Sequence, residues 1–364
     1  LSYADDNFLY ALTNPGAMPC DEEFFNLTNG KYGLDAKYLL CNGPFHVSKW
    51  TEKTSVKLAK NNEYNGESSV SPSSVTFYIN NDDSEVADKM NSVTYDVAFL
   101  SSSQFSSIEN KKDLNSVAVQ NVTYSFIFNQ NDNNYRNKNM RLAFCRSCDT
   151  SSLFDSQSDI SKADGIVPPS CKIGGEDYRN GNAAELLSYD ETLAKKNFND
   201  ALLDLGSSSV ETTILCTEQY EPFVKQMVQK LQKTLGVKFV STVKVVSESD
   251  LEAAVNDGNY SVAFYPFKAK SSFAGEIIEG FDQNNIFGYE SDVLSQKIRN
   301  IKNNSGSLEG ERSAVADAEN YLVSEAVIMP VFYENSYFVT SKKTSGIYFY
   351  SSADNVCFIN AKKS

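Results

Sequence analysis

An α/β fold with two lobes is predicted by three features of the 364-residue sequence. The chain is longer than the roughly 150 residues of a common single domain. A pattern of strand, helix and strand occurs at 75–99 and again at 212–264. Between these segments, at 117–148, the spacing of apolar residues changes from two to three and four, as it does where a strand is followed by a helix.

The composition excludes several classes of partner. The net charge is −14 and the isoelectric point is about 4.7, so the chain repels the phosphates of nucleic acids and of anionic lipids. No apolar run reaches the ~20 residues that span a bilayer. The start of the chain has neither the basic nor the apolar part of a leader peptide. We therefore expect a chain that is soluble as given, that binds no nucleic acid, and whose targeting signal was removed or never included.

Metal and redox chemistry are not expected. The seven cysteines are an odd number, so at least one thiol is unpaired within the chain. Cys145 and Cys148 lie three apart in a helical pattern, where small buried residues are more common than a redox motif. A zinc site needs four ligands, and His46 is the only histidine. We predict no metal site and no cofactor.

The first half of the chain is predicted to contain a β-α-β unit. Residues 75–79 alternate between apolar and polar, as in a strand, and residues 95–99 do so again. Asp83 or Ser84 is placed to cap the helix between them. Three earlier elements are also predicted, an amphipathic helix and two strands, at 1–13, 45–50 and 55–59.

The stretch at 117–148 is where we expect the chain to pass from one lobe to the other. Its apolar residues alternate over 117–128 with one slip at Gln120 and Asn121, which indicates a single strand with an irregular pleat. From Asn139 onward the spacing is that of a helix of about two turns, after a polar loop. The alternative is a core strand and a core helix inside one domain.

The second half of the chain repeats the alternation of strands and helices more fully. Strands are predicted at 212–216, 237–246 and 260–264. A helix at 219–235 ends at Gly236, and a shorter helix opens with a capping box of Ser249 and Glu252. The two halves thus share a helix-strand unit, which favours two lobes of similar construction.

The tips of these units predict where a ligand binds. In open α/β sheets, ligands lie beyond the carboxyl ends of the strands, because backbone donors and helix amino ends converge there. The two equivalent tips are 101–104 and 266–272. If the lobes face each other across the crossing, both tips line one cleft, which is the layout of a two-lobed solute-binding protein. The alternative is that both tips are solvated loops.

Six short motifs follow one another along the chain. They lie at 41–64 (with NGPF at 42–45 and Trp50), 126–149 (with Arg141), 166–169, 285–289, 318–322 and 328–332. In this order they resemble extracellular solute-binding protein family 5, the oligopeptide-, dipeptide- and nickel-binding proteins of ABC importers.

The resemblance implies a periplasmic-binding-protein-like fold of type II with a ligand cleft between its lobes. The change of spacing at 117–148 and the repeated helix-strand unit predict a first hinge crossing near 117–128, and the resemblance implies a second near 328–338. Lobe 1 is therefore expected at 1–121 and 334–364, and lobe 2 at 122–333. The resemblance implies the substrate-binding component of an ABC importer, which captures a peptide or other small polar solute. Such a protein is expected to be a monomer that delivers its solute to a membrane permease. It is expected at the extracellular face of the membrane or in the periplasm, with a lipid anchor on the full-length protein.

Three departures from the family limit these implications. The family's chains are longer, so an amino-terminal portion of lobe 1 is expected to be missing, with a sheet edge uncovered and ligand poorly held. Peptide binders of the family offer an aspartate after the strand that matches 260–264, whereas this chain has Lys268 and Lys270 there and no acid over 262–275. Lysines repel an ammonium group and favour a carboxylate or an uncharged polar ligand. The tryptophans common in that loop are also absent.

A binding protein is the preferred interpretation over an enzyme. The candidate ligand-binding residues are Ser101, Ser102, Gln104, Tyr124, Asn129, Tyr265, Lys268 and Lys270. A hydrolase is less favoured, because a catalytic triad would have to use His46 beside a Gly–Pro turn, and no phosphate-binding glycine motif is present. A second alternative is a surface adhesin or scaffold that has lost its transport function.

Overall fold

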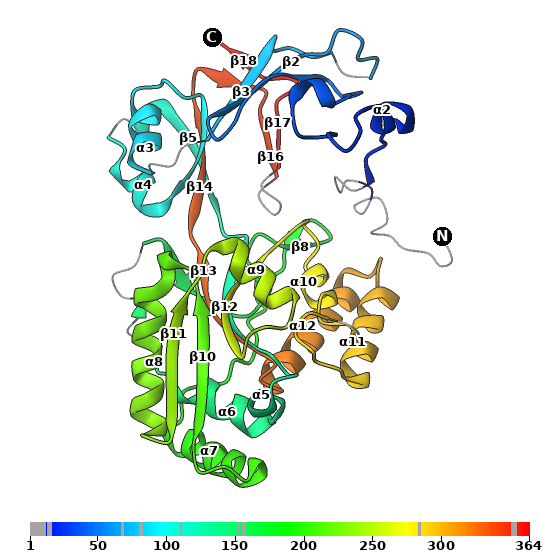
Figure 1. The fold of residues 1–364 in the computed structure, drawn as a ribbon. Coiled ribbons are helices and arrows are strands. Elements are labelled where there is room, and N and C mark those ends of the chain that lie inside the picture. Colours follow the sequence, from blue (N-terminus) through cyan, green and yellow to red (C-terminus); the bar gives the residue numbers. More distant parts are fainter. Residues whose placement is uncertain are drawn as a thin grey trace. The chain divides into compact units, whose positions relative to one another are not determined.

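Two compact units make up the computed structural model (Figure 1). The structure describes residues 12, 17–66, 69–79, 83–109, 111–150, 153–154, 158–282, 285–350 and 355–364. Unit 1 contains Gln120–Asn335, and unit 2 contains the described residues before Gln120 together with Ser336–Ser364. The predicted lobe boundaries were 121/122 and 333/334. The predicted helix at 1–13, apart from Leu12, lies outside the described residues.

Unit 1 is built on a six-stranded mixed sheet with the strand order β11-β10-β12-β6-β13-β7. Its strands are β6 (Val122–Phe128), β7 (Ile160–Lys162), β10 (Val210–Cys216), β11 (Phe239–Val245), β12 (Val262–Lys268) and β13 (Ile328–Glu334). β10 is parallel to β11 and to β12, whereas β6 is antiparallel to both β12 and β13. β13 therefore runs in the same direction as β10, β11 and β12.

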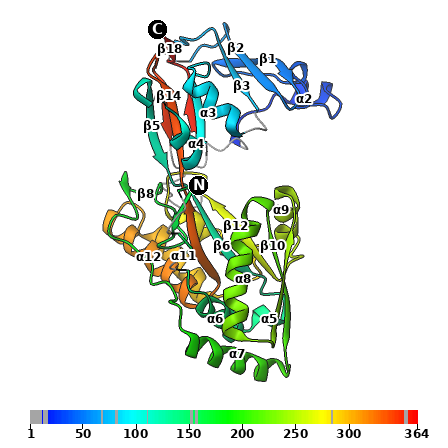
Figure 2. The same ribbon diagram turned by 90° about the vertical axis from the view of Figure 1, so that its left-hand side faces the viewer.

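Helices cover both faces of this sheet (Figures 1 and 2). One face packs on α6 (Lys138–Ser147), α7 (Glu191–Leu205) and α8 (Glu221–Leu235), and the other on α9 (Glu248–Asn256), α10 (Gly275–Glu279), α11 (Asp292–Asn303) and α12 (Leu308–Ser324). Phe126 and Phe128 enter the first core, whereas Ile127 enters the second. Because both faces are covered, six of the seven residues of β6 are buried, including the polar Thr123 and Ser125.

The strands and helices predicted for the second half are confirmed as β10-α8-β11-α9-β12, with two differences. Ser247, rather than Ser249, caps α9, because its hydroxyl accepts a hydrogen bond from the Asp250 N–H at 3.1 Å. β12 continues past the predicted end at 264 to Lys268, which pairs with Val122 of β6. The segment 266–268 is thus part of a strand rather than of a loop.

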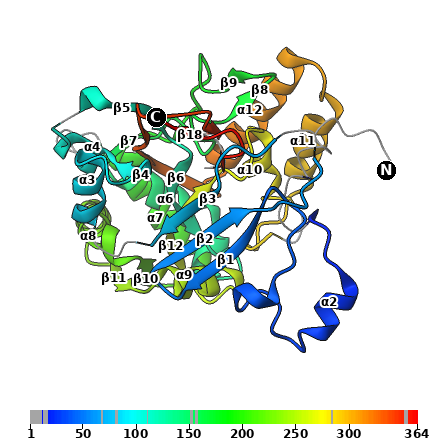
Figure 3. The same ribbon diagram turned by 90° about the horizontal axis from the view of Figure 1, so that it is seen from above.

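Unit 2 contains two three-stranded sheets. The first, β1-β2-β3, is made of Phe45–Thr51, Ser55–Lys60 and Ser74–Tyr78 (Figure 3, blue). The second, β4-β14-β5, is made of Val97–Ser101, Ser336–Ser341 and Leu114–Val119. α3 (Asp83–Asn91) and α4 (Ser102–Ser107) cover one face of the second sheet, over Ala98, Leu100 and Val339. The short β16 (Tyr348–Tyr350) places Phe349 against the other face, stacked on Phe338 at 4.1 Å.

Two predictions for the first half are wrong. Residues 75–99 are not one β-α-β unit, because β3 and β4 belong to different sheets and β4 is antiparallel to β14, a strand from the end of the chain. Residues 117–128 are not one strand. The slip at Gln120 and Asn121 separates β5 of unit 2 from β6 of unit 1, because β5 pairs with β14 and β6 pairs with β12 and β13. The polar loop before Asn139 also contains the short helix α5 (Asn133–Arg136).

A polar network holds the two ends of unit 1 together. The Gln120 side-chain amide donates to Asn335 Oδ1 at 2.8 Å and to Ser161 Oγ at 2.9 Å. Ser161 Oγ donates in turn to Asn335 Oδ1 at 3.0 Å. The Gln120 carbonyl accepts from the Ser170 N–H, and the Asn335 N–H donates to the Asp159 carbonyl. The segments that enter and leave unit 1 are therefore fixed side by side.

A buried arginine fastens α6 to the end of α12. Arg141 donates through Nη1 to the carbonyls of Tyr135 and Arg136, at 2.8 and 3.0 Å. It donates through Nε and Nη2 to the carbonyls of Ala326 and Glu325, at 3.0 and 3.1 Å. One guanidinium thus donates to four carbonyls from two chain segments. The planar guanidinium of arginine suits this role because its N–H donors point in several directions.

Replacing this arginine is expected to destabilise unit 1. In Arg141→Leu the four carbonyls lose their donor, and each orphaned buried acceptor costs ~1–3 kcal/mol, so we expect a loss of at least about 3 kcal/mol. Thermal unfolding followed by far-ultraviolet circular dichroism measures it. The control is Arg299→Leu at an exposed position of α11, for which we expect a change within about 0.5 kcal/mol. Equal losses of stability in the two variants would show that the hydrogen bonds of Arg141 do not stabilise unit 1.

Candidate functional site

Four strands of unit 1 end at one edge of the sheet, here called the carboxyl edge. β10, β11, β12 and β13 all point their carboxyl ends there, and β6 begins there because it runs the opposite way. The turn η5 (Glu218–Tyr220) and the first residues of α8 and α9 follow β10 and β11 at this edge. Backbone donors of helix amino ends and the side chains after each strand therefore gather at the carboxyl edge.

Aromatic and acidic side chains lie together at the carboxyl edge on the face that α8 covers. The rings of Tyr124 and Tyr220 are 4.4 Å apart, and both contact Phe332, at 5.0 and 5.3 Å. The Tyr220 hydroxyl donates to Glu334 Oε1 at 3.0 Å. Burial raises the pKa of both tyrosines, and the negative charge of Glu334 raises them further. Both phenols therefore remain protonated hydrogen-bond donors at neutral pH.

A lysine and a glutamate lie on one row across the start of β6. Lys268 is paired with Val122, and Glu334, one residue past the Tyr333–Thr123 pair, comes opposite Val122 from the other side. Residues directly opposite in antiparallel strands point to the same face, so Lys268, Glu334 and Tyr124 share the α8 face. Two strand spacings put the two charged residues' Cα atoms ~10 Å apart. Lys270 is exposed just beyond, at the same edge.

Asn129 does not lie at this edge, and its place among the candidates is corrected. It follows β6, which is antiparallel to the strands around it, so it lies beside Ser261 at the start of β12. Six residues of strand separate these ends, or ~20 Å. Asn129 is 4% exposed, donates to the carbonyls of Gly258 and Tyr260, and accepts from the Asn131 N–H. Its amide thus holds a loop together.

The remaining four candidates fall into two places. Tyr265 is paired with Ser125 and points to the face opposite Tyr124, where it packs on Phe267. Ser101, Ser102 and Gln104 lie together in unit 2 at the start of α4. There Ser101 and Gln104 form a capping box, because the Ser101 hydroxyl accepts from the Gln104 N–H and the Gln104 side chain accepts from the Ser101 N–H. Of the eight candidates, the structure brings Tyr124, Lys268 and Lys270 to the carboxyl edge.

Sequence reasoning missed two residues of the carboxyl edge. Tyr220 lies just after the end of β10, as Lys268 lies at the end of β12. The expectation that a ligand lies beyond the carboxyl ends of the strands therefore also points to Tyr220. Glu334 ends the strand that begins at the last family-like motif, 328–332. Glu334 was not considered, because the charged residue expected to bind the end of the ligand was sought after residue 264.

Comparison with known proteins identifies the family. The sequence model described as "Bacterial extracellular solute-binding proteins, family 5 Middle" matches residues 1–287. The chain belongs to this family. The resemblance stated from the six motifs is thereby confirmed, and membership of a family of extracellular solute-binding proteins favours binding over catalysis.

Individual relatives of this family 5 protein resemble it at low sequence identity. The dipeptide-binding protein DppE of Bacillus subtilis (strain 168) is 23% identical over 348 residues, which are 93% of this chain and 63% of the relative. The oligopeptide ABC transporter substrate-binding domain of Bacillus anthracis superposes with a TM-score of 0.80 at 18% identity, over 99% of this chain and 72% of that one. Listeria monocytogenes OppA bound to peptide gives 0.78 at 20% identity, over 100% and 72%. The predicted fold class is confirmed, and the chain spans 63% of the length of its curated relative.

Some features are not found in this family 5 protein within the described residues. No three histidine, cysteine or acidic side chains among them are grouped as metal ligands. None of the described helices is both long and apolar enough to cross a bilayer.

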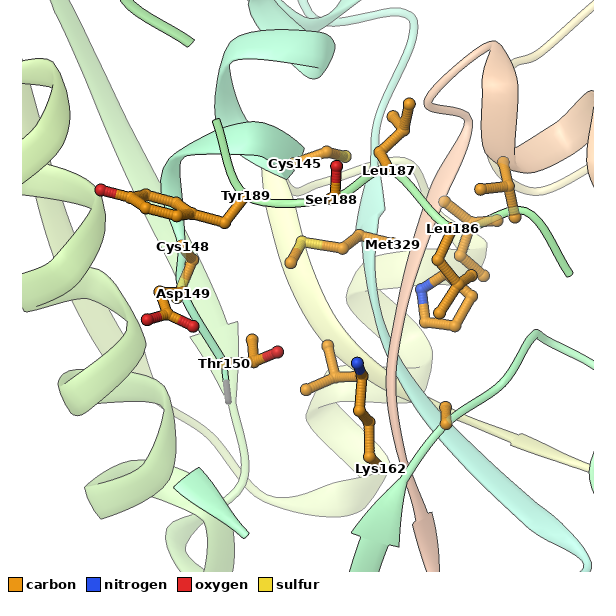
Figure 4. Close-up of a pocket in the computed structure, with 15 residues that line it drawn as sticks. Cys145, Cys148, Asp149, Thr150, Lys162, Leu186, Leu187, Ser188, Tyr189 and Met329 are labelled. Atoms are coloured by element: carbon orange, nitrogen blue, oxygen red, sulfur yellow. The ribbon is translucent and has the colours of Figure 1, made fainter. Parts of the chain in front are cut away.

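A cavity of about 220 Å³ lies in unit 1, away from the carboxyl edge, beside the first half of β13 (Figure 4). Leu186, Leu187 and Met329 supply apolar walls, and the thiols of Cys145 and Cys148 lie in its wall on the α6 side. Burial raises the pKa of both thiols to about 12. They are therefore poor nucleophiles, which agrees with the structural role expected for them.

These thiols are expected to make unit 1 sensitive to alkali. In the unfolded chain a thiol ionises near pH ~8.5, whereas the buried thiols stay protonated to about pH 12. Above pH ~8.5 the unfolded state therefore binds fewer protons than the folded state, and stability falls as the pH rises toward 12. We expect the double variant Cys145→Ala/Cys148→Ala to lose less stability between neutral pH and about pH 10 than the parent, measured by urea unfolding at each pH.

Cys20 provides the control for this experiment, because its thiol is exposed. Cys20→Ala is expected to keep the parent's dependence of stability on pH. If the stability of the double variant and that of Cys20→Ala depend on pH in the same way, Cys145 and Cys148 do not cause the sensitivity to alkali.

Proposed function

We propose that the chain is the solute-capturing part of an ABC importer and that it binds a short peptide at the carboxyl edge of unit 1. The observation that supports this most is the row of Lys268, Val122 and Glu334, with opposite charges ~10 Å apart beside Tyr124 and Tyr220. The peptide class is also supported by relatives described as a dipeptide-binding protein, as OppA bound to peptide, and as Helicobacter pylori DppA in complex with the peptide STSA.

The charges suit the two ends of a zwitterionic chain. Lys268, with Lys270 beside it, attracts the terminal carboxylate, and Glu334 attracts the terminal ammonium. An extended chain advances ~3.3–3.6 Å per residue, so a peptide of two or three residues spans the distance from Lys268 to Glu334. The tyrosine rings offer an apolar surface with hydroxyl donors at its rim. As parts of the same proposal, the protein is a monomer that passes its solute to a membrane permease and is held at the cell surface by a lipid anchor.

Removing the lysines tests the carboxylate end. Calorimetric titration of di- and tripeptides should show that Lys268→Ala/Lys270→Ala weakens binding by about 1.5–3 kcal/mol, the worth of a hydrogen bond to a charged group. Peptides with an amidated carboxyl terminus should bind the parent and the double variant equally weakly. Lys195→Ala/Lys196→Ala, two exposed lysines of α7 in the same unit, is the matched control. If free and amidated peptides lose the same affinity in the double variant, the lysines do not bind the carboxylate.

Removing the acid tests the ammonium end. Glu334→Gln keeps an acceptor for the Tyr220 hydroxyl but removes the charge, so peptides with a free amino terminus should bind about tenfold or more weakly. Amino-acetylated peptides should bind the parent and Glu334→Gln with similar affinity. Glu311→Gln on α12 is the control. An unchanged affinity for free peptides in Glu334→Gln would assign the ammonium to another group.

A further inference from the structure

A strap of chain, residues 184–190, borders the cavity beside β13 in unit 1. The strap has no regular secondary structure and leads into α7. Its backbone is tied at both ends, because the Ala184 N–H donates to the Asp164 carbonyl at 2.7 Å and the Asp190 N–H donates to the Arg146 carbonyl at 3.0 Å. Residues 186–189 lie between these ties and line the cavity. The fold therefore sets the width of the cavity.

The walls of the cavity are mostly apolar. The apolar side chains come from α6 and its cap, the strap, α12 and β13: Cys145, Cys148, Leu186, Leu187, Val323, Ile328, Met329 and Val331. An apolar cavity of roughly 150 Å³ holds a benzene molecule. The cavity here measures about 220 Å³, so it has room for a ring or a branched chain of that size together with one small polar group.

A lysine lies at the opening of the cavity. Lys162 is the last residue of β7 and is paired with Phe332 of β13. Residues directly opposite in antiparallel strands point to the same face, so Lys162 lies on the face that α6 and α8 cover, as the cavity does. Its ammonium nitrogen is turned toward the cavity (Figure 4). Among the described residues, none forms a hydrogen bond or ion pair with this ammonium.

The acidic residue at the opening lies elsewhere. Figure 4 shows Asp149 on the Cys148 side of the cavity, apart from Lys162. Lys230 of α8 donates to the Asp149 carbonyl at 2.7 Å, so a second cation lies beside that acid. The hydroxyl of Thr150 is turned toward the cavity between the two sides (Figure 4). A carboxylate at the Lys162 side is therefore offered an ammonium and a hydroxyl donor.

We propose that this cavity is a second ligand site, which takes a small monocarboxylate whose apolar body is about the size of a phenyl ring. The apolar body lies between the strap and β13, and the carboxylate pairs with Lys162 at the opening. Small-molecule sites combine apolar walls with a few polar groups that fix the orientation of the ligand, and this cavity has both. The site is separate from the carboxyl edge, so its ligand does not compete with the peptide proposed there.

The charge of the ligand is tested by ligand-detected NMR titration of phenylacetate and of phenylacetamide, its neutral isostere. We expect the parent to bind phenylacetate at least about tenfold more tightly than phenylacetamide. Lys162→Met keeps the apolar stem but removes the ammonium, so it should bind both probes as weakly as the parent binds the amide. Lys244→Met should keep the parent's preference. It is the matched control, because Lys244 is an exposed lysine on β11, the edge strand at the other end of the same sheet.

The cysteines report where phenylacetate binds. Cys145 and Cys148 line the cavity, whereas Cys171 and Cys216 are buried elsewhere in unit 1. At a concentration about ten times its dissociation constant, phenylacetate should slow the alkylation of Cys145 and Cys148 by iodoacetamide about tenfold. Alkylation of Cys171 and Cys216, followed in the same samples by peptide mass spectrometry, should keep its rate. A ligand that only stabilised unit 1 as a whole would slow all four reactions alike.

Three results would overturn the proposal. In the first, phenylacetate does not bind the parent, or the parent binds the acid and the amide equally. In the second, Lys162→Met keeps the preference for the acid, which assigns the carboxylate to another cation. In the third, the four buried cysteines are protected alike, or di- and tripeptides displace phenylacetate, which places the probe at the carboxyl edge instead of in the cavity.

Discussion

The direction of β6 is the constraint on which the layout of unit 1 depends. β6 is paired along its length with β12 on one side and with β13 on the other, and it is antiparallel to both. Its amino end therefore lies among the carboxyl ends of the neighbouring strands. The chain enters at Gln120 and leaves at Asn335 at that same edge, and Lys268, Tyr124 and Glu334 fall on one face there. A parallel β6 would have brought Asn129 to this edge in place of Tyr124.

Buried polar side chains explain why the family's motifs identify a fold rather than a solute. Arg141 and Asn129 use their donors on backbone carbonyls. Glu319 accepts from the Val167 N–H, the Tyr178 hydroxyl and Arg179. Asn285 donates to the Tyr289 carbonyl and accepts from the Tyr289 N–H. These side chains fix loops that have no regular pairing of their own. Solved structures with only 18–20% sequence identity share the fold.

Elements that depend on local sequence were predicted well, and placements that depend on distant strands were not. Periodicity and caps located α8, β10 and β11, because strand spacing and Gly236 act within a few residues. The supposed β-α-β unit failed because β4 pairs with β14, which no local pattern reveals. The positions of the candidate site residues followed the same division. Lys268 was expected beyond the end of a strand and lies at the carboxyl edge, whereas Asn129 lies at the opposite edge because strand direction is set by pairing. Glu334 shares a row with Lys268 only through the pairing of β13 with β6, which no local pattern reveals.

The discontinuity of unit 2 has a consequence for the order of folding. β14 is the central strand of its second sheet, yet Val119 of β5 and its partner Ser336 are 217 residues apart in the chain. At synthesis rates of about 5–20 residues per second, the sheet waits on the order of ten seconds or more for its middle strand. Unit 1 is continuous between these points and is complete first. β4 and β5 therefore lack their middle strand throughout that interval, and their unpaired edges are exposed to other chains until β14 arrives.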